Sequence, residues 1–363
     1  MTAPARIAVI GSGFIADHYL DALRRVRDHD VVAVASRNER SARELAERYG
    51  IASIEPDATT VAGRDDIDLA VVAVPHDSHV GVIEALAGGG KAVVCTKPLG
   101  RNADEAARCL AAVGRAGVWH GYAESAVFAP GVVEARRLVD AGAIGRALWV
   151  RAREAHGHPH DFARDRERMG GGPLRGLGIH CVAIGRYLMP GDRPTEVLAW
   201  ADRLHRDDVE VEDSVVMIVR FPDGRITQVE SAWTHVAGLD VRTEVHGSEG
   251  WIHTDETGET GVRAFAGASA GVVVEKAGSD RGWINPVPEE GHAYGFHAEM
   301  AHFVESFNAG VLPRQTFLDG VIDNAIVDAG YRAAEAGRWV PIEYPAIRDQ
   351  PLPDLSSGAR RTA

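Results

Sequence analysis

The amino-acid sequence predicts an α/β protein with two domains, the first built on a parallel sheet and the second on an open, largely antiparallel one. Three observations lead to this fold class. The chain has 363 residues, which is enough for two or three domains of ordinary size. In its first third, continuous apolar strands alternate with helices, as they do in a parallel sheet that is covered on both faces. From about Arg146 onward, half-buried strands are joined by short turns, which is typical of an antiparallel sheet.

The first domain begins with strand, tight turn and helix. Its buried strands are expected at residues 6–10, 31–35, 68–74 and 92–95. Gly11 ends the first strand, and apolar residues at helical spacing follow over 15–27. After the second strand, Asn38 is the expected N-cap of a helix that runs through Arg48 and ends at Gly50.

The second domain alternates apolar and polar residues along its strands. These strands are expected at 147–152, 215–219, 227–233 and 241–245. Turns such as Pro222-Asp223-Gly224 separate them. Helices return over 296–308 and 319–335, and the tail from 346 to 363 is expected to be mobile.

Composition and charge limit the partners. The chain carries 39 Lys and Arg against 52 Asp and Glu, a net charge of −13, so no basic excess is present to displace counterions from phosphates. We therefore expect no nucleic-acid partner and no membrane partner. The three cysteines, Cys95, Cys109 and Cys181, have no metal-type spacing and are typical of reduced thiols. Because Met1 to Arg6 leave no room for a signal peptide, we expect a cytoplasmic protein.

A glycine-rich turn is the first candidate binding site. Gly11-Ser12-Gly13-Phe14-Ile15-Ala16 has the pattern G-x-G-x-x-A between a strand and a helix. The first glycine permits the tight turn, and the second lets the backbone approach a pyrophosphate at the helix N-terminus. In this context the turn predicts dinucleotide binding, with Gly11, Ser12, Gly13, Phe14 and Ile15 at the cofactor.

The end of the second strand indicates which dinucleotide is bound. An acidic side chain there would hold a ribose 2′-hydroxyl, whereas an arginine would accommodate a 2′-phosphate. The sequence places Ser36 and Arg37 at this point. This favours NADP over NAD as the cofactor, although Arg37 could equally lie over the adenine ring.

Two strand-end segments carry a resemblance to a known family. Pro75-His76-Asp77-Ser78-His79 and Cys95-Thr96-Lys97-Pro98-Leu99, together with the glycine turn, resemble the glucose-fructose oxidoreductase / inositol dehydrogenase / MocA family. The resemblance implies that Pro75 and His79 border the nicotinamide. It also implies that Lys97 corresponds to the lysine of the family's E-K-P motif, which lies in the active site at the cofactor and the substrate. The glutamate of that motif is Thr96 here. A lysine at this sheet edge could orient or protonate a substrate oxygen, and otherwise would be a surface lysine paired with a carboxylate.

The glycine-rich segment that ends at His180 resembles the family's second motif, D-x-G-x-H. The resemblance implies that His180 is the catalytic acid/base, a role that suits an imidazole with an ordinary pKa near 6.5. The assisting aspartate is Gly176 here, and a second family position is Ala183. Residues four apart share one helix face, so the missing carboxylate would have contacted the imidazole. Otherwise His180 is a helix histidine bonded to a backbone carbonyl.

Further aromatic and histidine side chains are candidate substrate contacts. His156, His158 and His160 alternate along the chain and would point to one side in an extended segment, where they could bind a metal or sugar hydroxyls. Because Gly157 and Pro159 interrupt a regular strand, we expect no metal. Trp233 and Tyr294 are weaker candidates, because each is as readily a core residue.

The resemblance extends from Arg6 to about Val340 and implies both domain organisation and function. A Rossmann NAD(P)-binding domain would occupy residues 1–122, and a substrate and oligomerisation domain 123–345. The active site would lie between them, and the second sheet would form a homodimer or homotetramer. The implied activity is hydride transfer between nicotinamide and a secondary alcohol of a sugar, inositol or related polyol. The alternatives are a lyase or glycosidase that retains its nicotinamide for transient oxidation, and a catalytically silent NAD(P)-binding regulator.

Overall fold

The structure is a computed structural model that describes residues 4–345 except 237, 259–261, 263, 267, 269–280, 285 and 288. The described residues form two compact units. Unit 1 holds the chain up to Ala123, Phe296–Ile322 and residues 344 and 345, and unit 2 holds Glu124–Gly295 and Asp323–Glu343. The first boundary lies one residue beyond the expected one. The sequence-based division places Phe296–Ile322 in the second domain, whereas these residues contact unit 1. The expected mobile tail, 346–363, lies outside the described residues.

Unit 1 is built on a parallel sheet in the order β3-β2-β1-β4-β5-β6. The strands are β1 (Ala5–Ile10), β2 (His29–Ala35), β3 (Ser53–Glu55), β4 (Leu69–Val72), β5 (Ala92–Thr96) and β6 (His120–Ala123). This order places β1 in the middle of the sheet, beside β2 and β4. The expected parallel sheet is confirmed, and its arrangement is the Rossmann type, in which ligands bind outside the carboxyl ends of the strands.

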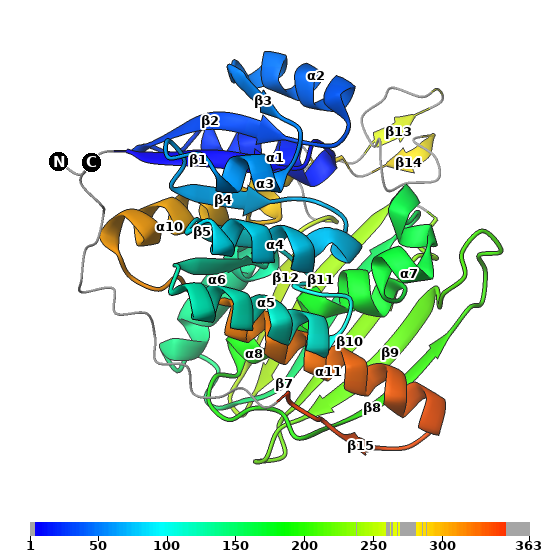
Figure 1. Ribbon diagram of the computed structural model, residues 1–363. Helices are drawn as coiled ribbons and strands as arrows, with labels where there is room; N and C mark the ends of the chain where they lie inside the picture. The colour runs from blue at the N-terminus through cyan, green and yellow to red at the C-terminus, as the bar shows by residue number, and fades with distance from the viewer. Residues whose placement is uncertain are drawn as a thin grey trace. The chain divides into compact units, whose positions relative to one another are not determined.

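Helices connect these strands. They are α1 (Phe14–Leu23), α2 (Glu39–Tyr49), α3 (Ala58–Ala62), η1 (His76–Ser78), α4 (His79–Gly88) and α5 (Ala103–Ala116). Helix α10 (Phe296–Ala309) also belongs to this unit but comes from a later part of the chain. The predicted caps of α2 are confirmed: Asn38 Oδ1 accepts a hydrogen bond from Ser41 N at 3.2 Å, and Gly50 has a φ of +70°. Although α10 is distant in sequence, it contacts α1, and the two helices lie side by side in Figure 1.

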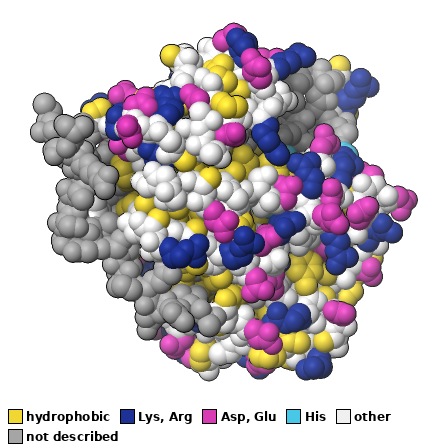
Figure 2. All heavy atoms as spheres, viewed as in Figure 1, with side chains coloured by type: hydrophobic (Ala, Val, Ile, Leu, Met, Phe, Trp, Pro, Cys, Tyr) yellow, Lys and Arg dark blue, Asp and Glu magenta, His cyan; other side chains and the backbone are white. Residues whose placement is uncertain are grey.

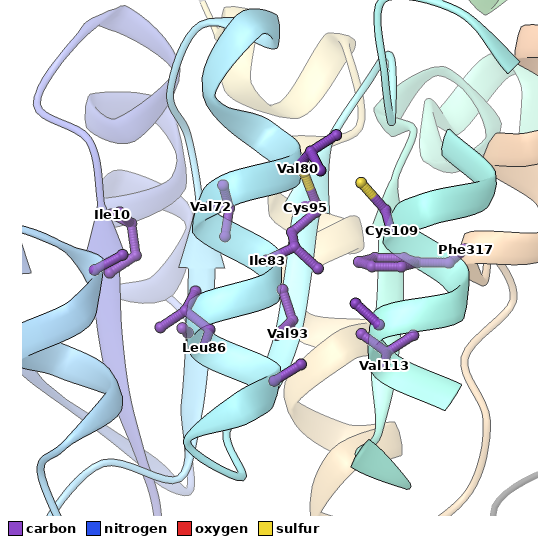
Figure 3. Packing of buried hydrophobic residues seen from close by; sticks show 14 of the residues in the cluster. Ile10, Val72, Val80, Ile83, Leu86, Val93, Cys95, Cys109, Val113 and Phe317 are labelled. Atoms are coloured by element: carbon purple, nitrogen blue, oxygen red, sulfur yellow. The ribbon is translucent and has the colours of Figure 1, made fainter. Parts of the chain in front are cut away.

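One hydrophobic cluster of unit 1 lies between the sheet and the helices α4 and α5. Figure 3 shows Ile83 and Leu86 of α4 directed toward Val72 and Val93 of the sheet. Cys95 and Cys109 belong to the same buried cluster, and all three cysteines of the chain are free and buried. Burial raises the pKa of the Cys109 thiol to about 12, so it packs as a small apolar side chain.

Unit 2 is built on a mixed, mostly antiparallel sheet in the order β12-β11-β7-β10-β9-β8-β15. The strands are β7 (Ala147–His156), β8 (Glu196–Asp202), β9 (Ser214–Arg220), β10 (Ile226–Ala232), β11 (Leu239–Gly247), β12 (Trp251–Asp255) and β15 (Val340–Pro341). Strands β7 and β10 pair in parallel, and the other pairs are antiparallel. A separate short hairpin joins β13 (Ala264–Ala266) and β14 (Gly282–Ile284). The expected largely antiparallel sheet is confirmed.

Unit 2 also contains helical segments, several of which contact strands of this sheet. They are η2 (Ser125–Phe128), α6 (Pro130–Asp140), η3 (Asp161–Arg164), α7 (Arg166–Met169), η4 (Leu174–Gly178), α8 (Ile179–Leu188), α9 (Glu290–Ala293) and the later part of α11 (Phe317–Ala336). Within this group, α8 contacts both β7 and β10. The inward side chains of β7 therefore meet the residues of α8.

The surface carries mixed charge. On the face drawn in Figure 2, basic and acidic side chains are interspersed, although the chain as a whole has a net charge of −13. This mixing is the usual pattern of a globular protein surface. Among the described residues, none of the helices combines the length and apolar character needed to cross a membrane.

Candidate active site

The glycine turn lies at the carboxyl ends of β1, β2 and β4. Gly11 N donates to Ala35 O at 2.8 Å, and Ala73 N donates to Ile10 O at 2.7 Å, so three strand ends meet at this turn. Gly11 has a φ of +122°, and a Cβ built there would lie 2.1 Å from Ala73 O. Only glycine fits this position without displacing the backbone.

The N-terminus of α1 is open for a ligand. Gly13 is exposed and is the N-cap residue of α1, and a Cβ there would meet nothing within 4 Å among the described residues. The N–H groups at the start of a helix favour an anion. Gly11 therefore fits a tight turn and Gly13 fits a backbone that a pyrophosphate can approach. Phe14 and Ile15 begin the same helix and are half-buried.

Three serine hydroxyls connect the glycine turn to the end of β2. Ser12 Oγ donates to Ser36 Oγ at 2.8 Å and also lies 2.6 Å from Ser41 Oγ. The structure thus brings Ser12 and Ser36 together, as expected for two residues at one cofactor. Arg37 follows and is exposed. The carboxylate of Glu55, at the end of the adjacent strand β3, is bonded by Arg64 at 2.6 Å.

His79 is engaged within the protein rather than exposed at a surface. It is fully buried, with Nε2 at 2.9 Å from Val74 O and Nδ1 at 3.3 Å from Leu99 O. Burial lowers the pKa of His79, and the hydrogen bonds to these carbonyls oppose that shift. His79 therefore holds the segment after β4 against the segment after β5. Pro75 precedes it and is half-buried, and contact of either residue with a cofactor stays a prediction.

Lys97 lies directly after β5 at the carboxyl edge of the parallel sheet. Its backbone N–H donates to Ala123 O at 3.1 Å, which fixes the segment against the end of β6. The Lys97–Pro98 peptide bond is cis, and Lys97 is half-buried. The location is the edge where doubly wound sheets bind ligands. The catalytic role of Lys97 stays a prediction.

His180 is the second residue of α8 and follows a π-helical turn, η4. Its side chain is 9% exposed, and Nδ1 contacts the carboxylate of Glu124. The expected i, i+4 relation to Gly176 is altered, because a π-helix has more residues per turn than an α-helix and shifts the facing residue. A Cβ at Gly176 would lie 2.4 Å from the Met169 methyl group, so that space is filled by an apolar side chain.

His180 belongs to a group of two carboxylates and two imidazoles. We call these four residues, Glu124, Glu154, His156 and His180, the His180 cluster. Glu154 Oε2 lies 4.0 Å from His180 Nε2, and Glu154 Oε1 lies 3.2 Å from His156 Nε2. The four residues therefore alternate as carboxylate and imidazole. All are buried, with exposed fractions of 7% or less. A buried histidine between two carboxylates is suited to exchanging a proton with a bound hydroxyl.

Tyr294 lies close to the His180 cluster. Its hydroxyl is buried, and its pKa is raised well above the ordinary value by burial and by the charges of Glu154, Glu290 and Glu256. The phenol therefore stays protonated and can donate a hydrogen bond.

Glu256 contributes a pH-dependent term to stability. Both carboxylate oxygens are buried, and burial raises the pKa of Glu256 to about 7, although the neighbouring Thr254 hydroxyl lowers it. Because the folded state prefers the protonated acid, its stabilising contribution is complete below the unfolded pKa near 4.5 and is lost as the pH rises to about 7.

We expect Glu256→Gln to remove this dependence. Between pH 4.5 and pH 8, wild-type protein should lose up to about 3 kcal/mol of unfolding free energy relative to the variant. Denaturant unfolding at several pH values measures the difference. The matched control is Glu249→Gln, at an exposed glutamate of the same unit, which should leave the pH dependence unchanged. Parallel curves for wild type and Glu256→Gln would contradict the assignment.

The histidines after β7 occupy three different environments. His156 is the last residue of β7 and belongs to the His180 cluster, as described above. His158 Nδ1 accepts a hydrogen bond from Arg206 at 3.2 Å, and burial and then the Arg206 charge lower its pKa. The His160 ring stacks on Phe162 with centroids 6.1 Å apart. Since the strand ends at His156, the regular one-sided row is not formed, and His156 is the member best placed for substrate contact. Within the described ranges, no three His, Cys, Asp or Glu side chains are arranged to hold a metal ion.

Trp233 is placed in the hydrophobic interior of unit 2. It is 2% exposed and belongs to a buried cluster with Met169, Leu177 and Val211. This is the core environment that the sequence left open as an alternative. Its backbone N–H donates to Asp213 O at 2.8 Å. Trp233 therefore packs in the hydrophobic cluster that includes Leu177 of η4. Direct contact of Trp233 with a substrate stays a prediction.

The sequence-based search missed Glu124 and Glu154. A signal for Glu154 was present, because Val150, Ala152, Glu154 and His156 share one face of β7 by the two-residue strand period. An acid on a face that is otherwise buried and apolar indicates a functional or paired carboxylate. Glu124 follows β6, whose four residues contain Gly121 and His120 and no continuous apolar run. No strand is therefore predicted directly before Glu124, and its position at a strand end could not be inferred.

The parallel sheet, the glycine turn open at Gly13 and the buried histidine cluster define an oxidoreductase of the dinucleotide-binding class. Comparison with known families agrees with this class. Residues 5–122 match the oxidoreductase family with an NAD-binding Rossmann fold, and residues 132–253 match the GFO/IDH/MocA C-terminal domain. The chain belongs to the Gfo/Idh/MocA family of oxidoreductases.

Individual relatives span nearly the whole chain. Inositol 2-dehydrogenase of Rhizobium meliloti (strain 1021) is 28% identical over 93% of this chain and 99% of its own length. D-apiose dehydrogenase of Paraburkholderia graminis is 25% identical, over 98% of this chain and 94% of its own. The crystal structure of GenD2 from gentamicin A biosynthesis in complex with NAD is similar with a TM-score of 0.87 and 28% identity, covering 94% of this chain and 97% of that one.

Proposed function

We propose that this chain is a dehydrogenase that transfers hydride between NAD(P) and a secondary alcohol of a sugar, inositol or related polyol. The observation that carries the proposal is the His180 cluster, in which an imidazole with 9% side-chain exposure contacts a buried carboxylate through Nδ1. Oxidation of an alcohol requires a base that removes the hydroxyl proton as hydride leaves the carbon. The names of the relatives, inositol and apiose dehydrogenases, support the substrate class.

The residues of unit 1 fit the dinucleotide. Gly11, Ser12 and Gly13 would hold the pyrophosphate at the N-terminus of α1, since Gly13 leaves space there and Gly11 shapes the turn. When bound, the nicotinamide supplies the chemistry of accepting or donating hydride. Phe14, Ile15, Pro75 and His79 would form the remaining contacts that the sequence predicts.

In the proposed reaction His180 Nε2 takes the proton of the substrate hydroxyl and returns it in the reverse direction. Lys97 would orient and polarise the same oxygen by donating a hydrogen bond from its ammonium group. Glu154, His156 and Tyr294 would bind neighbouring hydroxyls, because carboxylate, imidazole and phenol together offer both acceptors and donors. Several such contacts are what a polyol, rather than a simple alcohol, can satisfy.

The test is a panel of sugars, inositols and related polyols, with nicotinamide absorbance as the readout. Purified protein is first checked for cofactor already bound. We expect net reduction of added NAD(P)⁺ by at least one polyol. Tight cofactor binding without net redox turnover would favour the alternatives, and product analysis by mass spectrometry then separates them. Products of elimination or glycoside cleavage would indicate the lyase or glycosidase. If every compound of the panel is recovered unchanged, the result would indicate the regulator.

We infer that NADP is preferred to NAD. Ser36 and the exposed Arg37 follow β2, and the carboxylate of Glu55 on the adjacent strand is already bonded by Arg64. A guanidinium beside a hydroxyl suits a 2′-phosphate. The NAD complex of GenD2 is a reason to measure both cofactors.

We expect Arg37→Ala to weaken NADPH binding by about 10-fold or more, because a charge-assisted phosphate contact contributes about 1.5–3 kcal/mol. NADH binding should change less than about 3-fold. Fluorescence titration of both cofactors measures the two dissociation constants. The matched control is Arg40→Ala, since Arg40 is bound to Glu44 at 2.9 Å on the exposed face of α2. Equal losses for NADPH and NADH would remove this role from Arg37.

A homodimer or homotetramer through the second sheet is also proposed. Trp149 of β7, Trp200 of β8 and Trp251 of β12 are 37%, 47% and 63% exposed, and by strand register they share the sheet face opposite the helices. Exposed aromatic residues gathered on one face are typical of an interface. Size-exclusion chromatography with light scattering should give two or four times the mass of one chain, and a monomer at micromolar concentration would contradict the proposal.

A further inference from the structure

The contact between Glu124 and His180 joins two segments that are far apart in the chain. Glu124 follows β6, and His180 begins α8, yet the Glu124 carboxylate meets His180 Nδ1. We propose that Glu124 is the positioning residue of His180, fixing its tautomer and stabilising its protonated form. This rests on the proposed function, in which His180 is the acid/base. It assigns to a distant glutamate the task for which Gly176 has no side chain.

The surroundings of Glu124 specify the direction of the hydrogen bond. Glu124 is 0% exposed, and its Oε1 also accepts a hydrogen bond from Ala126 N at 3.2 Å, at the start of η2. An ionised Glu124 can only accept, which would place the proton on His180 Nδ1. The neutral ring then has its lone pair on Nε2. This is the atom that can accept a proton from a substrate hydroxyl.

The other ring nitrogen, Nε2, lies farther from its neighbouring carboxylate. Glu154 Oε2 is 4.0 Å from His180 Nε2, which is longer than a hydrogen bond, whereas the Nδ1 side is closed by the fully buried Glu124. The two carboxylates therefore differ in task. Glu124 binds the ring at Nδ1, and Glu154 lies beside Nε2, the nitrogen that would exchange the substrate proton.

Other charged groups on the elements packed against α8 face other partners. Arg136 of α6 bonds Asp140 at 2.8 Å, and Arg175 of η4 binds Asn324 and Asp328 of α11. On β10, Glu230 contacts Arg153 on the opposite face of the sheet. Two carboxylates of the described residues, Glu124 and Glu154, have oxygens within 4.0 Å of the His180 ring nitrogens. Of these, Glu124 is the one that bonds Nδ1.

The kinetic test compares Glu124→Gln with Glu124→Ala. The glutamine keeps the size of the side chain and an oxygen for Ala126 N, but it removes the charge. We expect Glu124→Gln to lower kcat by about 10²-fold with KM for the polyol within about 3-fold, since a neutral partner stabilises the imidazolium less. The acid limb of the kcat–pH profile should move to lower pH by about one unit. The glutamate control is Glu212→Gln, at a half-buried carboxylate that accepts from Gly172 N at 3.1 Å, and this variant should leave the acid limb in place.

Full activity and an unshifted acid limb in Glu124→Gln, with loss only in Glu124→Ala, would reduce Glu124 to a cap of η2 and overturn the proposal. Circular dichroism and thermal unfolding of each variant separate this result from misfolding. Glu124→Asp supplies a charged but shorter side chain. It should recover part of the kcat that Glu124→Gln loses, and no recovery together with wild-type folding would also contradict a role through charge.

A second measurement does not depend on turnover. In ¹⁵N-histidine-labelled protein, subtraction of the His180→Gln spectrum assigns the two ring nitrogens of His180. We expect the neutral ring to be protonated at Nδ1 in wild type and to shift toward the Nε2–H form in Glu124→Ala. Protonation at Nε2 in wild type would overturn the proposal. If no polyol is oxidised but the Nδ1–H form is found, the proposed function fails while the positioning of His180 by Glu124 stands.

Discussion

Replacement of His180 by glutamine is expected to lower kcat by about 10²–10⁴-fold, the range for loss of a general acid/base. The physical reason is that Nε2 of His180 would exchange the hydroxyl proton, and an amide has no basic nitrogen at working pH. Binding of NADPH should stay within about 2-fold, because His180 belongs to unit 2 and the glycine turn belongs to unit 1. Steady-state kinetics on the best polyol and fluorescence titration measure both quantities. Lys97→Ala is expected to lower kcat by at least about 10²-fold in the same assay.

The matched control for His180→Gln is His253→Gln, the same substitution at an exposed histidine of β12. This variant should retain wild-type kcat and stability. Wild-type turnover in both His180→Gln and Lys97→Ala would remove the proposed acid/base assignment. A loss of folding in His180→Gln, seen by circular dichroism, would instead assign His180 a structural role with Glu124.

Replacement of Gly11 by alanine is expected to destabilise unit 1 by about 3 kcal/mol or more. A φ of +122° is strained for any residue with a side chain, and the new Cβ would lie 2.1 Å from Ala73 O. Strands β1 and β4 would have to separate where Ala73 N bonds Ile10 O. Thermal or urea unfolding measures the loss, and dinucleotide binding should fall with it.

Gly13→Ala is the matched variant two residues away. Gly13 has an extended backbone with φ −93° and ψ −170°, and a Cβ there would meet no described atom within 4 Å. Stability should change by no more than about 1 kcal/mol, while NADPH and NADH affinity should fall about 10-fold or more because the methyl group would occupy the pyrophosphate's approach. Unchanged affinity in a folded Gly13→Ala protein would exclude this turn as the dinucleotide site.

Much of the fold could be predicted because several elements are specified locally. Helix α2 has a side-chain cap at Asn38 and a left-handed Gly50, and both signals lie within a few residues of the helix itself. The short strands β3 and β6 were missed because neither contains a continuous apolar run. The return of α10 to unit 1 was also missed. The apolar face of α10 predicts that the segment is a helix, but it does not predict which element the helix packs against. That element, α1, lies near the other end of the chain.

The sequence predicts those site residues that can be recognised from their neighbours in the chain. It does not predict contacts between segments that are far apart in the sequence. Gly11, Gly13 and His180 are recognisable from neighbouring residues. In an α-helix a residue at position 176 would face His180, but Leu174–Gly178 form a π-helical turn. The carboxylate that does meet His180 comes from position 124. Nothing near either residue in sequence indicates that pairing, because it is created by the packing of α8 against β7 and η2.

The imidazole–carboxylate contact across 56 positions of the chain has an evolutionary consequence. When the acid is carried by a different element from the histidine, we expect position 124 rather than position 176 to carry the carboxylate in related sequences. In an alignment of homologues, glutamate at 124 and a non-acidic residue at 176 should therefore be inherited together. Sequences with this exchange would be scored as inactive by a search for an aspartate four residues before the histidine, although they retain an ionised partner for it.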